Sequence, residues 1–142
     1  MKIIVINGPN LDMLGKREPT VYGNNTLEDL ENYIRNEFKE KIDVEFFQSN
    51  YEGAIIDMLH RANDEFDGVV INPGAFTHYS YAIHDAIKSI KTKVVEVHIS
   101  NVHQREEFRQ KSVTAAACIG QISGLGFYGY ILGINAILNI NR

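Results

Sequence analysis

The sequence predicts an α/β fold with a five-stranded parallel sheet, and two patterns in the 142-residue chain lead to this expectation. Five short apolar runs alternate with segments whose apolar residues recur at helical spacing, which is typical of a parallel sheet covered by helices. The apolar runs are nearly continuous, as expected of strands that are buried on both faces. No linker or low-complexity segment interrupts the alternation, so we expect one domain over residues 1–142.

The first half of the chain contains two units of strand and helix. The strands are expected at Lys2–Asn7 and at about Asp43–Gln48. The first helix is expected to begin at Thr26, because Thr26 and Asp29 resemble a capping box and apolar residues then recur at helical spacing. The second helix carries its apolar residues between positions 54 and 62.

The second half supplies three more strands. The third, at 68–72, ends abruptly at Pro73, which cannot donate a hydrogen bond to a sheet. The other elements are expected as a helix at 78–90, a strand that starts at Val94, a strand at 116–122 and a helix at 127–139. Right-handed crossovers leave few topologies, and five strands fit the order 2-1-3-4-5 of a flavodoxin-like three-layer sandwich.

Composition and charge exclude several classes of protein. The formal net charge is −4 and the basic residues form no long stripe, so we expect no nucleic-acid partner. The one cysteine, Cys118, cannot form a disulfide within a chain, which favours a reducing compartment. The apolar run Ile3–Ile6 is shorter than the roughly 7–15 residues of a signal peptide, and no apolar span near about 18 residues exists. We therefore expect a cytoplasmic, soluble protein that makes no membrane contact.

Polar side chains gather where the expected strands end. The residues that end or follow the first, third and fourth strands include Asn7, Asn10, Asn72, His98 and Ser100. The strand entrances carry only Lys2, Asp43, Asp67 and Lys93. Because open α/β sheets bind ligands at the carboxyl ends of their strands, this asymmetry predicts a site at that edge of the sheet.

The stretch from Val94 to Arg109 is the most informative in the chain. Its apolar start predicts a buried strand, and Glu96 and His98 lie two residues apart, so their side chains share one face. A charged glutamate in a buried strand needs a partner, and a carboxylate beside an imidazole fixes the tautomer of the ring and raises its basicity. A solvated edge strand is the alternative, which the flanking valines disfavour.

Two further segments place candidate residues near the same edge. The loop 11–25 is long, lacks helical or strand periodicity, and holds Arg17 and Tyr22. Such a loop is either a lid that closes over the site or a plain mobile connection. His78 and Asp85 lie near the start of the third helix on roughly one side, where each also fits a helix cap or a surface position.

The segment Gly124–Gly129 spells the dinucleotide-binding fingerprint G-x-G-x-x-G. That fingerprint also requires a following strand and an acidic residue about 20 positions later, and no strand is expected after the last helix. The glycines Gly129 and Gly133 instead predict close packing of the last helix against a neighbouring element.

Six motifs, in order, resemble those of the type II 3-dehydroquinate dehydratase family over essentially the whole chain. They are NGPNL (7–11), GKREPTVYG (15–23), QSNYEG (48–53), NPGAFTHYS (72–80), EVHISNVHQREEFR (96–109) and GLGFYGY (124–130). The resemblance implies a flavodoxin-like subunit that assembles as trimers into a dodecamer. It also implies a lyase that dehydrates 3-dehydroquinate to 3-dehydroshikimate by anti elimination through an enolate, without a metal or cofactor. Both aromatic biosynthesis and quinate breakdown use this reaction.

The resemblance also implies a role for individual residues. Tyr22 matches the tyrosinate base that removes the proton beside the ketone, and Arg17 matches the arginine that assists it. His98 matches the acid that protonates the departing hydroxyl, Glu96 orients His98, and Asn10 holds the enolate through a water. Contacts to the substrate are expected from Asn72, His78, Arg109 and the backbone amides of Ile99 and Ser100, while Asp85 is expected to reach the site of a neighbouring subunit.

One stretch departs from the family pattern. After Arg109 the family often has a His-x-Ser-Tyr-like stretch, whereas this chain has Gln110–Val113. We expect these residues to pack or to touch a neighbouring subunit, so the departure bears on the assembly more than on the chemistry.

Two other interpretations stay open. A metal-dependent hydrolase would use His98, His78 and Glu96, and a non-catalytic flavodoxin-like binding module would share the fold. A receiver module should carry an acidic cluster after the first strand, where this chain has Asn7 and Asn10. A flavin-binding module should purify yellow.

Overall fold

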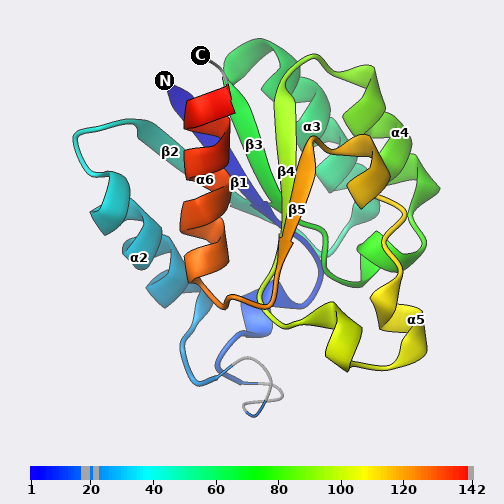
Figure 1. Cartoon of the computed structure of the whole chain (residues 1–142). Coiled ribbons are helices and arrows are strands. Elements are labelled where there is room, and N and C mark those ends of the chain that lie inside the picture. The colour runs from blue at the N-terminus through cyan, green and yellow to red at the C-terminus, as the bar shows by residue number, and fades with distance from the viewer. Residues whose placement is uncertain (17–19, 21–22, 141–142) are drawn as a thin grey trace.

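The computed structural model describes residues 1–16, 20 and 23–140, and it confirms the predicted architecture. A five-stranded sheet has the order β2-β1-β3-β4-β5, and every neighbouring pair of strands is parallel. The strands are β1 (Lys2–Asn7), β2 (Asp43–Gln48), β3 (Gly68–Asn72), β4 (Lys93–His98) and β5 (Gly120–Ser123). Helices cover both faces of this flavodoxin-like sheet, as Figure 1 shows.

Two pairs of helices form the outer layers. On one face lie α2 (Leu27–Phe38) and α6 (Tyr128–Ile140), and on the other lie α3 (Glu52–Glu65) and α4 (Tyr81–Ser89) (Figure 1). A short helix, α5 (Glu107–Gln110), follows β4. The expected capping box of α2 is confirmed, because the backbone N–H of Asp29 donates to Thr26 Oγ1 over 3.1 Å and the N–H of Thr26 donates to Asp29 Oδ2 over 2.9 Å.

The alternating side chains of the central strands feed two separate cores. Ile3 and Val5 of β1 pack toward α2 and α6, whereas Ile4 and Ile6 pack toward α3 and α4. Burial on both faces explains why these strands are continuous apolar runs in the sequence. It also leaves the strand ends as the places where polar groups can gather.

Two glycines permit close contacts that position these elements. A Cβ atom on Gly133 of α6 would lie 3.2 Å from Val97 and 3.4 Å from Val70, so the predicted close packing of the last helix is confirmed there. At Gly129 the same atom would make an ordinary contact of 3.5 Å. A Cβ atom on Gly8 would lie 2.5 Å from the carbonyl oxygen of Pro73, so the connections that leave β1 and β3 can meet only because position 8 is glycine.

The expected start of the third helix is wrong by three residues. The chain forms a 3₁₀ helix at Gly74–His78, and α4 begins only after the N-cap residue Ser80. The Oγ atom of Ser80 accepts the N–H of Ile83 over 3.0 Å and thereby satisfies one free donor of the first turn. His78 therefore belongs to the connection after β3 and not to the helix.

The expected fifth strand is also displaced. Ala115–Ala117 forms a 3₁₀ helix, and β5 starts at Gly120 instead of position 116. Alanine favours helical turns over strands, and this explains the error. Cys118, which was expected within the strand, follows the 3₁₀ helix, and burial raises the pKa of its thiol.

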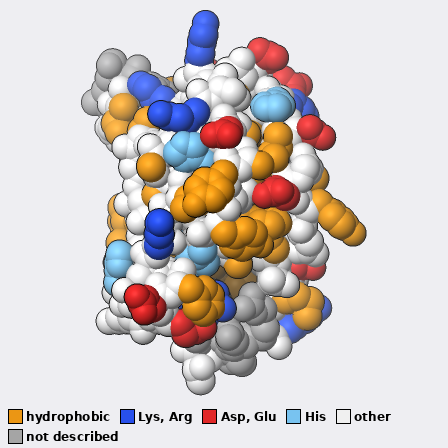
Figure 2. Space-filling view, turned by 90° about the vertical axis from the view of Figure 1, so that its right-hand side faces the viewer, with side chains coloured by type: hydrophobic (Ala, Val, Ile, Leu, Met, Phe, Trp, Pro, Cys, Tyr) orange, Lys and Arg blue, Asp and Glu red, His pale blue; other side chains and the backbone are white. Residues whose placement is uncertain are grey.

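Among the described residues, the structure shows no helix that is both long enough and apolar enough to cross a membrane. Figure 2 views the side of the molecule formed by α4 and α5, where hydrophobic side chains gather near the middle of the face. The exposed aromatic residues in and beside these two helices include Tyr79, Tyr81 and Phe108.

Candidate functional site

A cavity of about 110 Å³ lies at the carboxyl edge of the sheet. It is bordered by the residues that follow β1, β3 and β4, the edge at which open α/β sheets bind ligands. Seven of the eleven predicted site residues line it: Asn10, Asn72, His78, His98, Ile99, Ser100 and Arg109.

The other four predicted residues are placed differently. Glu96 lies behind His98 and is completely buried. Asp85 is an exposed residue of α4 and does not line the cavity. Arg17 and Tyr22 fall outside the described residues.

A second hollow adjoins the cavity. It shares Ile99 and Ser100 with the first, and Thr20 and Gly23 contribute to its lining. Thr20 and Gly23 are the described residues nearest to Tyr22 in the sequence. Both therefore border the same edge of the sheet.

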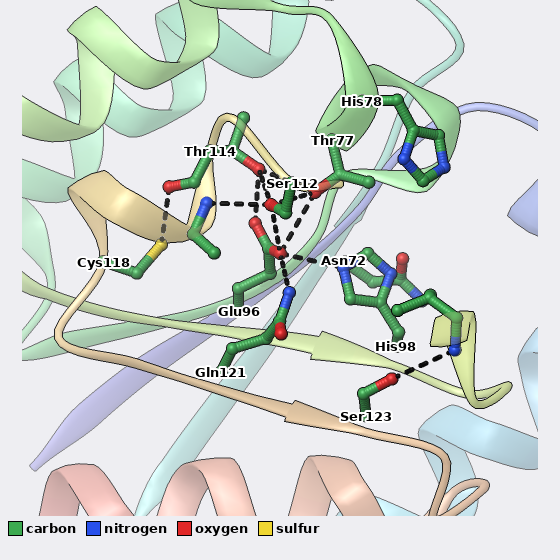
Figure 3. A network of polar contacts seen from close by, with 12 residues as sticks. Asn72, Thr77, His78, Glu96, His98, Ser112, Thr114, Cys118, Gln121 and Ser123 are labelled. Atoms are coloured by element: carbon green, nitrogen blue, oxygen red, sulfur yellow. Dashed lines mark hydrogen bonds and ion pairs between the residues drawn. The ribbon is translucent and has the colours of Figure 1, made fainter. Parts of the chain in front are cut away.

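The buried carboxylate of Glu96 accepts hydrogen bonds from residues of four different chain segments (Figure 3). The donors to Oε2 are Thr77 Oγ1 at 3.0 Å, Ser112 Oγ at 2.8 Å, Gln121 Nε2 at 2.7 Å and His98 Nε2 at 2.9 Å. The Oε1 atom accepts the hydroxyl of Thr114. These contacts confirm that Glu96 and His98 share one face of β4 and that this glutamate has the partners its burial requires.

The polar contacts determine the charge of Glu96. Burial by itself raises the pKa of this carboxyl, but the hydrogen bond and charge of His98, together with donation by Thr114 and Gln121, lower it to about 2. Glu96 is therefore an anion at any pH near neutrality. Four neutral groups, the hydroxyls of Thr77, Ser112 and Thr114 and the amide of Gln121, donate to this charge, and the fifth donor is the ring of His98.

The state of Glu96 fixes the tautomer of His98. An ionised carboxylate can only accept hydrogen bonds, so the Nε2 atom that contacts it must carry a hydrogen. The lone pair of the neutral ring then resides on Nδ1, and Nδ1 is the atom that gains and loses the second proton. This arrangement suits a general acid and base of defined orientation beside the cavity.

His78 has the opposite tautomer to His98. Its Nδ1 atom donates to the carbonyl oxygen of Lys111 over 2.7 Å, so the lone pair of the neutral ring lies on Nε2. Burial lowers the pKa of His78, and the nearby charges of His98 and Arg109 act in the same direction. A neutral imidazole is the form that these surroundings favour.

Arg109 and Asn10 also line the cavity. The guanidinium of Arg109 stacks over the ring of Phe108 at 4.7 Å, and its Nε donates to Glu106 over 3.2 Å. Asn10 has a positive φ of 69°, and its backbone N–H donates to Asn50 Oδ1 over 2.9 Å. Arg105 also lines the cavity, which thus combines two cations with neutral polar groups and suits a small polar anion.

The segment 111–114 supports both histidines. Lys111 holds His78 through its carbonyl oxygen, while Ser112 and Thr114 donate to Glu96. The departure from the family pattern at Gln110–Val113 was expected to pack or to touch a neighbouring subunit. In the structure, Ser112 and the carbonyl oxygen of Lys111 face the site, whereas the side chains of Gln110 and Lys111 are exposed.

Sequence reasoning missed four of the donors to Glu96: Thr77, Ser112, Thr114 and Gln121. Only Gln121 leaves a usable signal, because it is the Cα partner of Glu96 across the β4–β5 pair. That signal depends on the register of β5, which the expected strand at 116–122 did not locate. The three hydroxyl residues lie in connections, where no periodicity identifies an inward-pointing side chain.

Replacing Thr114 by valine should lower the free energy of unfolding at neutral pH by about 1.5–3 kcal/mol, since a hydrogen bond to a buried charge is lost. The folded-state pKa of Glu96, about 2, lies below the ordinary value of 4.5. The stabilisation of the fold by the ionised Glu96 is therefore fully present at pH values above 4.5 and is lost as the pH falls toward about 2. Urea unfolding at several values between about pH 3 and 7 measures this dependence.

A matched control for this variant is Thr92→Val. The hydroxyl of Thr92 donates to the carbonyl oxygen of Ala62 over 3.0 Å, so its acceptor is neutral. Its loss should destabilise the fold by an amount that does not change with pH. A pH-independent deficit for Thr114→Val as well would contradict the assignment of Glu96 as a buried anion.

The described geometry does not favour the metal site of the hydrolase alternative. No group of three or more His, Cys, Asp or Glu residues within the described part of the chain could hold a metal ion. Glu96 already accepts five hydrogen bonds, whereas an ionised carboxylate offers about four lone-pair sites. Of the three expected ligands, Glu96 and His98 are bonded to each other.

Comparison with known proteins shows similarity along the whole chain. The model of the family described as Dehydroquinase class II matches residues 1–138. The 3-dehydroquinate dehydratase of Clostridium acetobutylicum is 62% identical over 141 residues, which cover 99% of this chain and 98% of that protein. The 3-dehydroquinate dehydratase of Thermotoga neapolitana is 61% identical over 142 residues, with 99% and 97% covered.

Solved structures agree with these relatives. The type II dehydroquinase of Butyrivibrio crossotus superposes with a TM-score of 0.95 at 57% identity and 97% coverage of both chains. The type II dehydroquinase of Propionibacterium acnes gives a TM-score of 0.93 at 43% identity, with 97% of this chain and 96% of that chain covered. Both the sequence and the backbone are thus similar from one end of the chain to the other.

Proposed function

We propose, since the chain belongs to the class II dehydroquinase family, that it dehydrates 3-dehydroquinate to 3-dehydroshikimate. The curated relatives of about 60% identity carry the name 3-dehydroquinate dehydratase. The observation that carries the proposal at the level of chemistry is the buried Glu96–His98 pair at the edge of a cavity lined by Arg109. The whole chain, residues 1–142, acts as a single catalytic domain in this proposal.

The reaction removes a proton beside a ketone and a hydroxyl group from the next carbon. In the proposed mechanism the tyrosinate of Tyr22 takes the proton, and Arg17 stabilises the phenolate and the developing charge. His98 gives its Nδ1 proton to the departing hydroxyl, while its Nε2 keeps the hydrogen that it donates to Glu96. Asn10 holds the enolate through a water. The roles of Tyr22 and Arg17 rest on the family resemblance, and that of His98 is supported by the tautomer that Glu96 imposes.

The remaining predicted residues bind the substrate in this proposal. Arg109 pairs with the carboxylate, and Asn72, His78 and the backbone amides of Ile99 and Ser100 contact oxygen atoms of the substrate. Their common position around one cavity supports this assignment. Asp85 acts in the site of a neighbouring subunit, and its exposed position on α4 is consistent with that role.

The proposal extends to the assembly and the cellular role. We expect a cytoplasmic homododecamer, a tetramer of trimers, and the exposed aromatic residues on the side viewed in Figure 2 are suited to subunit contacts. The enzyme requires no cofactor in this proposal. Its reaction serves the shikimate pathway of aromatic amino-acid biosynthesis, with quinate breakdown as the second possible role.

Mixing the purified protein with 3-dehydroquinate should generate the ultraviolet absorbance of a conjugated enone. The same rate is expected after exhaustive chelation, because the proposed mechanism uses only the side chains and backbone of the protein. Loss of the rate on chelation with recovery on adding a divalent metal would favour the hydrolase alternative. A yellow preparation without enone formation would favour the flavin-binding module.

A further inference from the structure

The hydroxyl of Tyr130 joins the ends of two neighbouring strands. Tyr130 lies on α6 and is completely buried. Its hydroxyl donates to Asn7 Oδ1 over 2.6 Å and accepts the amide of Asn72 Nδ2 over 2.9 Å. Asn7 and Asn72 are the last residues of β1 and β3 and face each other as Cα partners across the strand pair.

The backbone N–H of Gly74 determines the direction of the hydrogen bonds that join Asn72, Tyr130 and Asn7, which we call the relay. The N–H of Gly74 donates to Asn72 Oδ1 over 3.1 Å, which assigns the oxygen of that amide and turns its nitrogen toward Tyr130. Because the phenol must then accept from Asn72, its own single hydrogen is available only for Asn7. Burial raises the pKa of Tyr130, so the phenol keeps this hydrogen near neutral pH.

The relay leaves Asn72 with a defined polarity toward the cavity. Its amide nitrogen carries two hydrogens, and Tyr130 accepts one of them. Because Asn72 also lines the cavity, the inference assigns the second hydrogen to a ligand. Its oxygen is already bonded to Gly74. A ligand at this point of the cavity therefore meets a donor that cannot rotate freely.

We infer that Tyr130 is a positioning residue that fixes Asn72 as a hydrogen-bond donor to an acceptor oxygen of the bound substrate. The inference rests on the proposed dehydratase function. It adds to that function a residue on the last helix, and it requires a substrate that presents a hydroxyl or carboxylate oxygen next to Asn72. The glycine-rich motif at 124–130 ends on this tyrosine.

The direct test is Tyr130→Phe, which keeps the ring and removes only the hydroxyl. We expect KM for 3-dehydroquinate to rise about tenfold, because a binding group loses its buried partner, with a much smaller change in kcat. The matched control is Tyr128→Phe on the same helix, whose side chain is 53% exposed and whose KM should be unchanged. An unchanged KM in Tyr130→Phe, with an active wild type, would overturn the inference and leave the proposed function intact.

A double-mutant cycle separates positioning from general stability. If Tyr130 acts through Asn72, then Tyr130→Phe should raise KM in the wild-type background and add less than about twofold in the Asn72→Ala background. If the effects of Tyr130→Phe and Asn72→Ala on KM multiply fully in the double variant, Tyr130 does not act through Asn72 and the inference is wrong.

A measurement on the wild type keeps the inference testable if the variants fail to fold. With ¹⁵N-labelled asparagine, one side-chain N–H of Asn72 should shift when 3-dehydroshikimate is added, while the N–H bonded to Tyr130 should move little. Enone formation without any shift of the Asn72 amide would contradict the inference. Absence of enone formation by the wild type would instead contradict the proposed function itself.

Discussion

Replacing Tyr22 by phenylalanine is expected to lower kcat for dehydration by about a thousandfold while the substrate still binds. Phenylalanine has no group that can accept the proton beside the ketone. The ordinary tyrosine pKa of about 10 means that a phenolate near neutral pH needs roughly 4 kcal/mol of preferential stabilisation. A guanidinium about 4 Å away supplies on the order of 4 kcal/mol at an effective dielectric constant near 20. Arg17, five residues from Tyr22 in the sequence, is proposed to supply it.

The initial rate of enone formation and the equilibrium affinity for the substrate together check this expectation. Tyr33→Phe is a matched control, because Tyr33 is an exposed residue of α2 and should tolerate the loss of its hydroxyl. Near-normal turnover by Tyr22→Phe would remove the proposed base and direct attention to another group.

Glu96→Gln should lower kcat by a factor between about a hundred and ten thousand. The carboxamide has the shape of the carboxylate but offers a single acceptor oxygen in surroundings that contain five donors. If its nitrogen faces His98, the ring must accept on Nε2, and its hydrogen moves to Nδ1. If its oxygen faces His98, the ring keeps its tautomer but loses the neighbouring charge that stabilises the imidazolium.

Nitrogen chemical shifts of His98 and the pH dependence of kcat distinguish these two outcomes. Circular dichroism and urea unfolding test whether the variant folds, since the buried donors lose part of their acceptor. Glu45→Gln is a suitable control, because Glu45 lies at the surface and pairs with Lys2 over 3.5 Å. Unchanged turnover and an unchanged ring in Glu96→Gln would show that the charge of Glu96 has no part in the chemistry.

The central strands and the Glu96–His98 pair could be predicted because their patterns are local. An apolar run that is buried on both faces identifies β1, β3 and β4 without any knowledge of their neighbours. The two-residue period of a strand then places Glu96 and His98 on one face. Each of these inferences uses only residues that are adjacent in the sequence.

The surroundings of the pair could not be predicted for the opposite reason. Ser112 lies 16 residues from Glu96, and Tyr130 lies 58 residues from Asn72, so no periodicity connects them. The alanine-rich stretch before β5 was assigned to the strand, so the register that pairs Gln121 with Glu96 could not be predicted. Contacts of this kind follow from the packing of whole elements.

The segment 111–114 has a consequence for local opening of the native state. Besides its contacts to His78 and Glu96, the N–H of Val113 donates to the carbonyl oxygen of Thr77 over 2.7 Å, and its carbonyl oxygen accepts from His84 over 2.7 Å. Local unfolding of this segment would break its hydrogen bonds to α4, to the connection after β3 and to the buried carboxylate of Glu96. We therefore expect the contacts that hold His78 and Glu96 to be lost together when the segment opens, and hydrogen exchange of the Val113 amide would report that opening.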